Sequence, residues 1–257
     1  MRVYSATGLV LHRTLLGETD KILTIYTREH GKISAVAKGA RKPGSRISGA
    51  TELFTCTRFL IGKGRSLDVV SQCEIIESYP ALRVDLEKLA RATYICELLD
   101  RMTLDRDESA CEILHDLTVG ALHLLGRAGN HPDGAVHAYE LYLLAELGYA
   151  PVLDKCARCG KEMPGITAAF SPSQGGVLCA DDRHIASDST PLSFDALQCL
   201  IALRDGDADS ILQIRMTGRT TAEIARAMRA YVAHRLDRSL KSAEFLEQLR
   251  HSHPGAR

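Results

Sequence analysis

The sequence has no tryptophan, and aromatic residues make up only 5% of its 257 residues. It also has no apolar run that approaches the roughly eighteen residues of a membrane-spanning helix. Its first residues, MRVYSATGLV, do not have the pattern of a signal peptide. We therefore expect a cytoplasmic protein without a membrane segment. In a reducing cytosol, clustered cysteines bind metals more often than they form disulfides.

Common catalytic motifs are absent as well. The sequence contains no G-x-S-x-G, no H-E-x-x-H and no G-x4-G-K-[ST] pattern. Its ten histidines are scattered, and no pair of carboxylates stands in a recognisable catalytic setting. There is no internal repeat and no low-complexity tract. These absences argue against an enzyme and leave a globular binding protein as the expectation.

The net charge is zero, with 32 basic and 32 acidic residues, so the bulk composition indicates no partner. The distribution is uneven, because residues 1–80 carry 12 Lys/Arg and 7 Asp/Glu, which leaves 20 and 25 for the remainder. Within 28–65, nine basic residues stand against Glu29 and Glu52 alone. A basic N-terminal third in a neutral chain favours an anionic partner.

The first eighty residues have the pattern of β-strands. Segments rich in β-branched and apolar residues cover 3–12, 20–27, 33–38, 51–62 and 67–78. The stretch 39–50 is rich in glycine, serine and basic residues and is expected to be an irregular loop. Five strands with one long connection predict an OB-type barrel over 1–79. An SH3-like barrel or a short sandwich would give a similar pattern.

Beyond residue 80 the apolar residues follow the 3.6-residue period of helices, over 86–99, 107–125, 135–149, 193–206 and 220–238. Ser193 is expected to cap the helix that follows it. By contrast, 154–186 has no such period. We therefore predict an α+β fold: a five-stranded OB-type barrel, then an α-helical domain over 80–257 with a zinc-ribbon-like knuckle inserted at about 154–186.

Three cysteines in the insertion have the spacing of a zinc knuckle: Cys156, Cys159 and Cys179. Zinc needs four tetrahedral ligands, and a Cys-x-x-Cys turn places two thiolates on one side of the ion. The fourth ligand is Asp182 if the second knuckle repeats that spacing, or His184, because imidazole is on average the better ligand. One structural ion would order a segment that has too few apolar residues to fold by burial.

Two other interpretations of these cysteines stay open. A thioredoxin-like redox pair needs a strand before the first cysteine and a helix that begins at it, whereas Cys156 stands between a helix end and a loop rich in glycine and proline. A knuckle that has lost its metal would have the same sequence. The five remaining cysteines stand singly among apolar residues and are expected in the core: Cys56, Cys73, Cys96, Cys111 and Cys199.

The predicted loop at 38–49 combines four basic residues with three glycines. On a barrel, such a loop binds phosphates, and its glycines allow the backbone to approach them closely. The alternative is an ordinary solvated loop. Because few aromatic residues are available to stack on bases, binding would depend on backbone charge and show little sequence preference. The candidate nucleic-acid-binding residues are Arg13, Lys38, Arg41, Lys42, Arg46, Lys63 and Arg65.

A second basic run lies in the C-terminal helices, where Arg226 and Arg229 share one helical face. It is either a second anion-binding face or an ordinary polar helix surface. Its candidate residues are Arg215, Arg219, Arg226 and Arg229.

Several segments together resemble the RecO family of bacterial DNA repair and recombination proteins. They are the opening GLVLHRTLLGETDKILTIYTREHGKISAVAKGARKPGSRISG, the pattern LDVVSQCEIIESYPALRVDLEKLARATYICELLD, the knuckle CARCG with GGVLC, and the closing LKSAEFL. The resemblance spans nearly the whole chain and is most specific at its start. It implies an OB fold, a helical domain with a zinc ribbon, and non-catalytic work on DNA.

The resemblance implies binding of single- and double-stranded DNA, annealing of complementary strands, and help in loading RecA onto strands coated by SSB. The implied partners are RecR and the C-terminal tail of SSB, with RecA reached indirectly, and the implied location is the nucleoid. The family's knuckle usually has a fourth cysteine where this chain has Asp182, which favours that carboxylate over His184. The alternative functions are a protein-contact adaptor for SSB and RecR, and a zinc hydrolase with an open coordination position.

Overall fold

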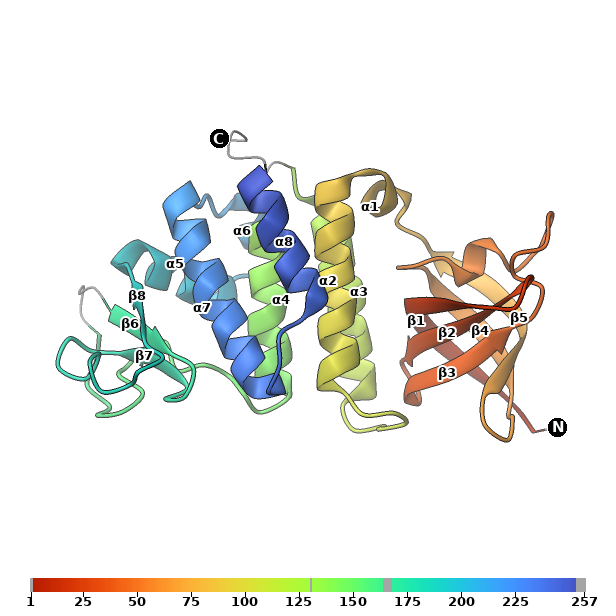
Figure 1. Ribbon diagram of the computed structural model, residues 1–257, viewed down its shortest axis with the longest axis horizontal. Coiled ribbons are helices and arrows are strands. Elements are labelled where there is room, and N and C mark those ends of the chain that lie inside the picture. Colours follow the sequence, from red (N-terminus) through yellow and green to blue (C-terminus); the bar gives the residue numbers. More distant parts are fainter. Residues whose placement is uncertain (1, 130, 164–167, 253–257) are drawn as a thin grey trace. The chain divides into compact units, whose positions relative to one another are not determined.

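The computed structural model describes residues 2–129, 131–163 and 168–252 of the chain (Figure 1). The chain forms two compact units, Met1–Gly126 and Arg127–Arg257. The first unit holds a β-barrel followed by helices, and the second holds helices and a small sheet. The domain boundary predicted between residues 79 and 80 stays a prediction.

Five strands form a closed barrel in the order β1-β2-β3-β5-β4 (Figure 1). The strands are β1 (Val3–Leu16), β2 (Asp20–Thr27), β3 (Gly31–Ala37), β4 (Cys56–Gly62) and β5 (Asp68–Glu77). Strand β1 pairs with β4 over its first half and with β2 over its second half, so it closes the barrel. Strands β3 and β5 run parallel to each other. This arrangement confirms the predicted OB-type barrel.

The barrel interior is filled by alternate side chains of its strands, as the period-2 pattern requires. Gly8 stands where β1 passes from one partner strand to the other, and a Cβ atom there would lie 2.4 Å from Cγ2 of Ile25. A larger residue would therefore push β1 away from β2. The buried residues of this core are Ala6, Val10, Leu23, Ile25, Ile33, Ala35, Ala37, Ala40, Phe59, Ile61 and Val70.

The connection between β3 and β4 is longer than the sequence suggests. The predicted loop at 39–50 is irregular and ends in a short 3-10 helix, Gly49–Thr51. The strand predicted from residue 51 begins only at Cys56, so its first five residues were assigned wrongly. Residues 51–55 have local, irregular backbone structure instead. Thr51 Oγ1 donates a hydrogen bond to the Ser48 carbonyl, and Phe54 has a left-handed φ of 64°.

Three helices complete the first unit: α1 (Pro80–Val84), α2 (Leu86–Met102) and α3 (Cys111–Arg127). Asp85 caps α2 by accepting hydrogen bonds from two backbone amides of its first turn. The helix predicted from residue 107 begins only at Cys111, and the earlier residues form a turn instead. In that turn, Asp107 accepts a hydrogen bond from the Ser109 amide, and Ala110 has a φ of 53°.

A buried lysine of the barrel caps the C-terminal end of α2. Lys32 on β3 is only 9% exposed. Its Nζ donates to the carbonyls of Asp100 at 2.6 Å and Thr103 at 2.9 Å, and lies 3.1 Å from the Asp100 carboxylate. A cation at a helix C-terminus satisfies carbonyls that have no partner within the helix and interacts favourably with the helix dipole. This contact fixes α2 to the barrel within the first unit.

The second unit packs around α4 (Asp133–Glu146), a helix that is buried on most of its faces. Helices α5 (Phe194–Asp205), α6 (Ala208–Gln213) and α7 (Gly218–Leu236) contact α4, and α8 (Lys241–Ser252) follows them. Strands β6 (Ala168–Ser171), β7 (Gly176–Leu178) and β8 (Thr190–Leu192) form a sheet in the order β7-β6-β8. No helix in the described ranges is both long and apolar enough to cross a bilayer.

The helical character predicted for the region beyond residue 80 is confirmed. Ser193 caps α5 as expected, because its Oγ accepts a hydrogen bond from the Ala196 amide. Segment 154–186 interrupts the helices and contributes the two strands β6 and β7 to the sheet. The fold class is thus an N-terminal closed barrel followed by a helical region with an inserted small sheet.

Replacing Lys32 by methionine should lower the free energy of unfolding of the first unit by about 2–3 kcal/mol. The change leaves the Asp100 carboxylate and two helix carbonyls without their shared donor. Chemical denaturation followed by circular dichroism measures the effect. The exposed Lys38 is the matched control, and Lys38→Met should change stability by less than about 0.5 kcal/mol. Equal effects of the two substitutions would contradict the capping role.

Candidate nucleic-acid interface and metal centre

The basic loop, residues 38–46, is fixed to the turn between β1 and β2 by hydrogen bonds. Asp20 Oδ1 accepts from the Gly39 amide at 2.8 Å and from Thr19 Oγ1 at 2.8 Å. The Arg41 amide donates to the Thr19 carbonyl at 2.9 Å, and Arg41 Nη1 donates to the Gly17 carbonyl at 3.3 Å. The loop is therefore anchored at its start although it has no regular structure. Sequence reasoning missed the anchor; its signal is a threonine–aspartate pair, Thr19 and Asp20, that follows the turn glycine Gly17 by one residue.

The basic side chains of this loop form no ion pair with the described residues. Lys38, Arg41, Lys42 and Arg46 are all exposed. Within the described ranges, no carboxylate lies within the 4.0 Å ion-pair distance of any of the four. The pKa of Asp20 is lowered, mainly by the hydrogen bond from the Gly39 amide and to a smaller extent by Lys38 and Lys42. The loop thus presents positive charge that Asp20 offsets only in part.

The other predicted residues of the barrel lie in different settings. Arg13 on β1 forms an ion pair with Glu52, which also binds Lys21 Nζ at 2.9 Å. Arg13 and Lys21 therefore share one carboxylate, and the three side chains together keep one positive charge. These contacts lower the pKa of Glu52, although burial alone would raise it.

Lys63 and Arg65 are exposed on the loop between β4 and β5, away from residues 38–46. Strands β3 and β5 are parallel, with Ala35 opposite Asp68. The β4–β5 loop precedes β5, whereas the basic loop follows β3, so the two loops leave this strand pair at opposite ends. The structure therefore separates the seven predicted residues into distinct groups.

The second basic run in the helices is partly neutralised within its own unit. Arg219 Nε lies 2.8 Å from Glu223, and Arg229 forms an ion pair with Glu247. Arg215 donates to the Leu212 carbonyl. Arg226 is exposed. The run therefore offers less free charge than the basic loop does.

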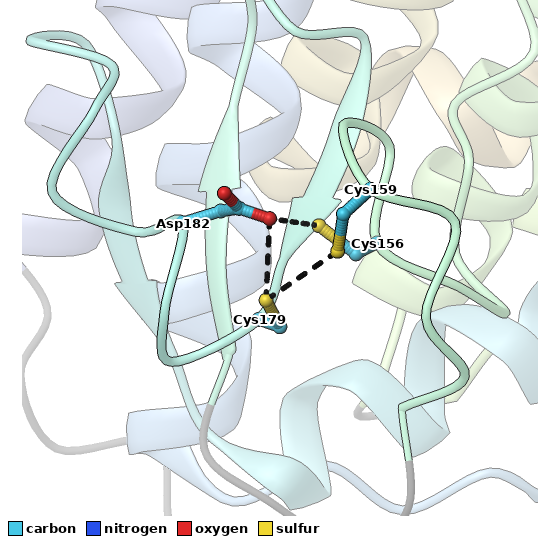
Figure 2. Close-up of side chains that lie close together, drawn as sticks. All are labelled: Cys156, Cys159, Cys179 and Asp182. Carbon is cyan, nitrogen blue, oxygen red and sulfur yellow. Dashed lines mark hydrogen bonds between the residues drawn. The ribbon is translucent and has the colours of Figure 1, made fainter.

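The predicted metal ligands Cys156, Cys159, Cys179 and Asp182 converge on one point. Their ligand atoms all lie within 4.8 Å of one another, and Figure 2 shows the three sulfur atoms and the carboxylate directed toward a common centre. Asp182 Oδ2 lies 3.3 Å from Cys156 Sγ and 3.4 Å from Cys179 Sγ, and the Cys159 and Cys179 sulfurs are 3.8 Å apart. Tetrahedral zinc, with bonds of about 2.3 Å to sulfur and 2.1 Å to oxygen, separates its ligands by about 3.6–3.8 Å.

Two tight turns position these ligands. In the first, the Gly160 amide donates to the Cys156 carbonyl, and Gly160 has a φ of 73° that favours glycine. In the second, the amides of Asp182 and Arg183 both donate to the Cys179 carbonyl. In the first turn the side chain of Cys159 returns toward Cys156, and in the second the side chain of Asp182 returns toward Cys179. The two turns thus place the four ligand side chains in one cluster.

The carboxylate and the thiols of the cluster interact strongly with one another. Hydrogen bonds from the thiols of Cys159 and Cys156 lower the pKa of Asp182. The shared carboxylate in turn raises the pKa of Cys159 to about 12. Burial would raise the pKa of Cys156, but backbone amides led by that of Cys159 outweigh it and lower it. Arg158 lies 3.9 Å from Asp182 and offsets part of the cluster's negative charge.

His184, the alternative fourth ligand, is outside the cluster. It is exposed, and its Nε2 lies 3.0 Å from the Arg183 Nε that donates to it. The three cysteines and Asp182 are a chemically suitable donor set for one metal ion, and four protein ligands leave no open coordination position. Such a set suits a structural ion.

Asp182→Ala should weaken zinc binding by more than the roughly 10–100-fold that loss of an outer-sphere partner costs. His184→Ala is the matched control and should bind zinc as the unaltered protein does. Asp182→Cys should bind more tightly, since thiolate replaces carboxylate. Elemental analysis and competition with a chelator measure these effects. Zinc content near zero in the unaltered protein, purified under reducing and zinc-replete conditions, would contradict the site.

The chain matches two family models that together cover most of its length. Residues 1–79 match the model described as Recombination protein O N terminal, and residues 83–244 match Recombination protein O C terminal.

Relatives of similar length are found in several bacteria. The DNA repair protein RecO of Symbiobacterium thermophilum is 41% identical over 252 residues, covering 97% of this chain and 99% of the relative. That of Pelotomaculum thermopropionicum is 39% identical over 248 residues, covering 96% and 95%. That of a Roseiflexus species is 36% identical over 249 residues, covering 97% and 87%. With both family models matched and such identity over nearly its whole length, the chain belongs to the RecO family of DNA repair proteins.

Proposed function

We propose that this protein is a non-catalytic DNA-binding recombination mediator. The observation that carries the proposal is the exposed basic loop on an OB-type barrel, whose four cationic side chains form no ion pair with any residue that the structure describes. Barrels of this type bind single strands by combining a positively charged surface with contacts to bases. Membership of a DNA repair family supports DNA as the anion that the loop binds.

The geometry of the loop suits binding to phosphates without reading sequence. Lys38, Arg41, Lys42 and Arg46 project from an irregular segment whose start is anchored to the β1–β2 turn. Cations that neutralise phosphates release condensed counterions, and this release dominates non-specific affinity. The same neutralisation reduces repulsion between two strands, so the loop would favour annealing of complementary single strands. Double-stranded DNA offers the same phosphates and is also bound.

The proposed partners follow from the family and rest on it. We assign to this protein cooperation with RecR, binding of the C-terminal tail of SSB by the helical region, and through these contacts the loading of RecA onto SSB-coated single strands. The proposed location is therefore the nucleoid. Zinc is assigned a structural role at Cys156, Cys159, Cys179 and Asp182, which lie in the second unit and not on the barrel.

Reversing two charges of the basic loop, as Arg41→Glu with Lys42→Glu, should weaken single-strand binding. The slope of log affinity against log salt should become shallower by about 1.4, since each lost phosphate contact contributes about 0.7. Fluorescence anisotropy with labelled oligonucleotides at several salt concentrations measures both effects. The matched control is Arg238→Glu with Lys241→Glu, two exposed residues of the second unit. An unchanged salt slope in the loop variant, or an equal loss of affinity in both variants, would contradict the assignment of DNA binding to the basic loop.

Annealing separates the mediator from an adaptor that acts mainly through protein contacts. The unaltered protein should accelerate pairing of complementary oligonucleotides, and the Arg41/Lys42 variant should do so less. Stopped-flow quenching of labelled strands, with and without SSB, measures the rate. An adaptor would leave the pairing rate at its spontaneous value.

A further inference from the structure

Two leucines at the end of β1 are exposed beside the basic loop. Leu15 is 62% exposed and Leu16 is 40% exposed. Successive residues of a strand point to opposite faces, so in a barrel wall one of the two would be buried. Both are nevertheless exposed at the end of the β1–β2 hairpin, where Leu15 pairs with the buried Lys21 and Leu16 pairs with Asp20.

The tip of the β1–β2 hairpin and the basic loop lie next to each other. Leu16 is paired with Asp20, whose carboxylate accepts a hydrogen bond from Gly39 in the basic loop. Lys38 and Lys42 lie near enough to Asp20 to lower its pKa. Arg41 binds the carbonyl of Gly17, the residue directly after Leu16. Apolar side chains and exposed cations are therefore held next to one another by backbone contacts.

We propose that Leu15 and Leu16 contact the unpaired bases of a single DNA strand whose phosphates are bound by Lys38, Arg41 and Lys42. A single strand offers both chemistries at once, anionic phosphates and the apolar faces of its bases. In a duplex, the base faces are covered by stacking. This inference rests on the proposed DNA-binding function and adds to it the residues that distinguish single strands from duplexes.

The composition of the surface explains why leucine has this role. Residues 14–20 and 38–48 contain no aromatic side chain that stacks on a base. Contact between an aliphatic side chain and a base face does not depend on a hydrogen-bonding pattern, so it tolerates any sequence. Leucine side chains also serve as apolar wedges between bases in other protein–DNA complexes. The charge of the surroundings favours an anionic strand over an apolar protein surface.

The double variant Leu15→Ser with Leu16→Ser should bind single-stranded DNA about tenfold more weakly, since about 1.4 kcal/mol of apolar contact is removed. Its salt slope should not change, because no phosphate contact is lost. Duplex binding should change by less than about twofold. The matched control is Val84→Ser with Leu104→Ser, 85% and 74% exposed in the same unit. Circular dichroism and thermal melting confirm that both variants are folded.

A second variant gives a direct optical signal. The protein has no tryptophan, so the substitution Leu15→Trp introduces a single indole fluorophore at the tip of the hairpin. Addition of a single-stranded oligonucleotide should quench and shift its emission through stacking on a base, and addition of the matching duplex should do so much less. The substitution Leu104→Trp is the control and should not respond to either.

The outcomes separate this inference from the function on which it rests. If the unaltered protein does not bind single strands, both the function and the inference fail. If it binds, but the serine variant keeps its affinity and the indole emission of the Leu15→Trp variant does not respond, the leucines do not contact bases and only the inference is overturned. The same holds if the serine variant loses binding only to a partner protein or to anionic vesicles. Loss of single-strand affinity at constant salt slope supports it.

Discussion

The fold of the first unit depends on one strand, β1, that is long enough to serve two partners. Its first half pairs with β4 and its second half with β2, and the pairing shifts between Val10 and His12. This double pairing closes the barrel, so the strand leaves no unpaired edge. The residues of β1 that lie beyond its pairing with β4 pair with β2 alone and lead into the tip of the β1–β2 hairpin. The tip in turn anchors the basic loop, through Asp20 and Thr19. Barrel closure and the placement of the candidate DNA-binding surface are therefore consequences of the same backbone pairing.

The sequence predicts the barrel and the helices because burial leaves a periodic signature, and it fails where local hydrogen bonds override that signature. The alternating pattern from residue 51 looks like a strand, but Thr51 donates to Ser48 and Phe54 adopts a left-handed φ. Likewise, the helical pattern from residue 107 includes residues that form a turn around Asp107. In both places the apolar side chains are spaced correctly, while the backbone groups are already bonded to nearby residues. The periodicity of apolar residues predicts which side chains are buried, but it does not predict which hydrogen bonds the backbone forms.

The two candidate sites also differ in how much of their geometry can be predicted from the local sequence. The metal ligands are close in sequence, so the spacing of two turns is enough to predict three of them, and local geometry then places Asp182 in the cluster and His184 outside it. The charges of the barrel depend on contacts between distant residues. Nothing in the local sequence shows that Glu52 neutralises Arg13, thirty-nine positions away. Nor does it show that exposed leucines lie beside the basic loop, because Leu15 has the same strand pattern as buried residues of β1.

The two candidate sites also lie in parts of the chain that are stabilised in different ways. The barrel has a continuous apolar core, whereas the cysteines of the knuckle segment belong to a small cluster of Cys156, Leu178 and Cys179 with Met163 and Ala186 packed against it. The strands of the segment are buried as well, and Phe170 on β6 packs against Tyr231 on α7. The two turns that carry the ligands lie outside these strands, and their four ligand atoms converge on one point. An ion bound there would join the two ligand-bearing turns, and the barrel, which lies in the other unit, contributes no ligand to it. The surface proposed to bind DNA therefore belongs to a part of the chain that is separate from the candidate metal site.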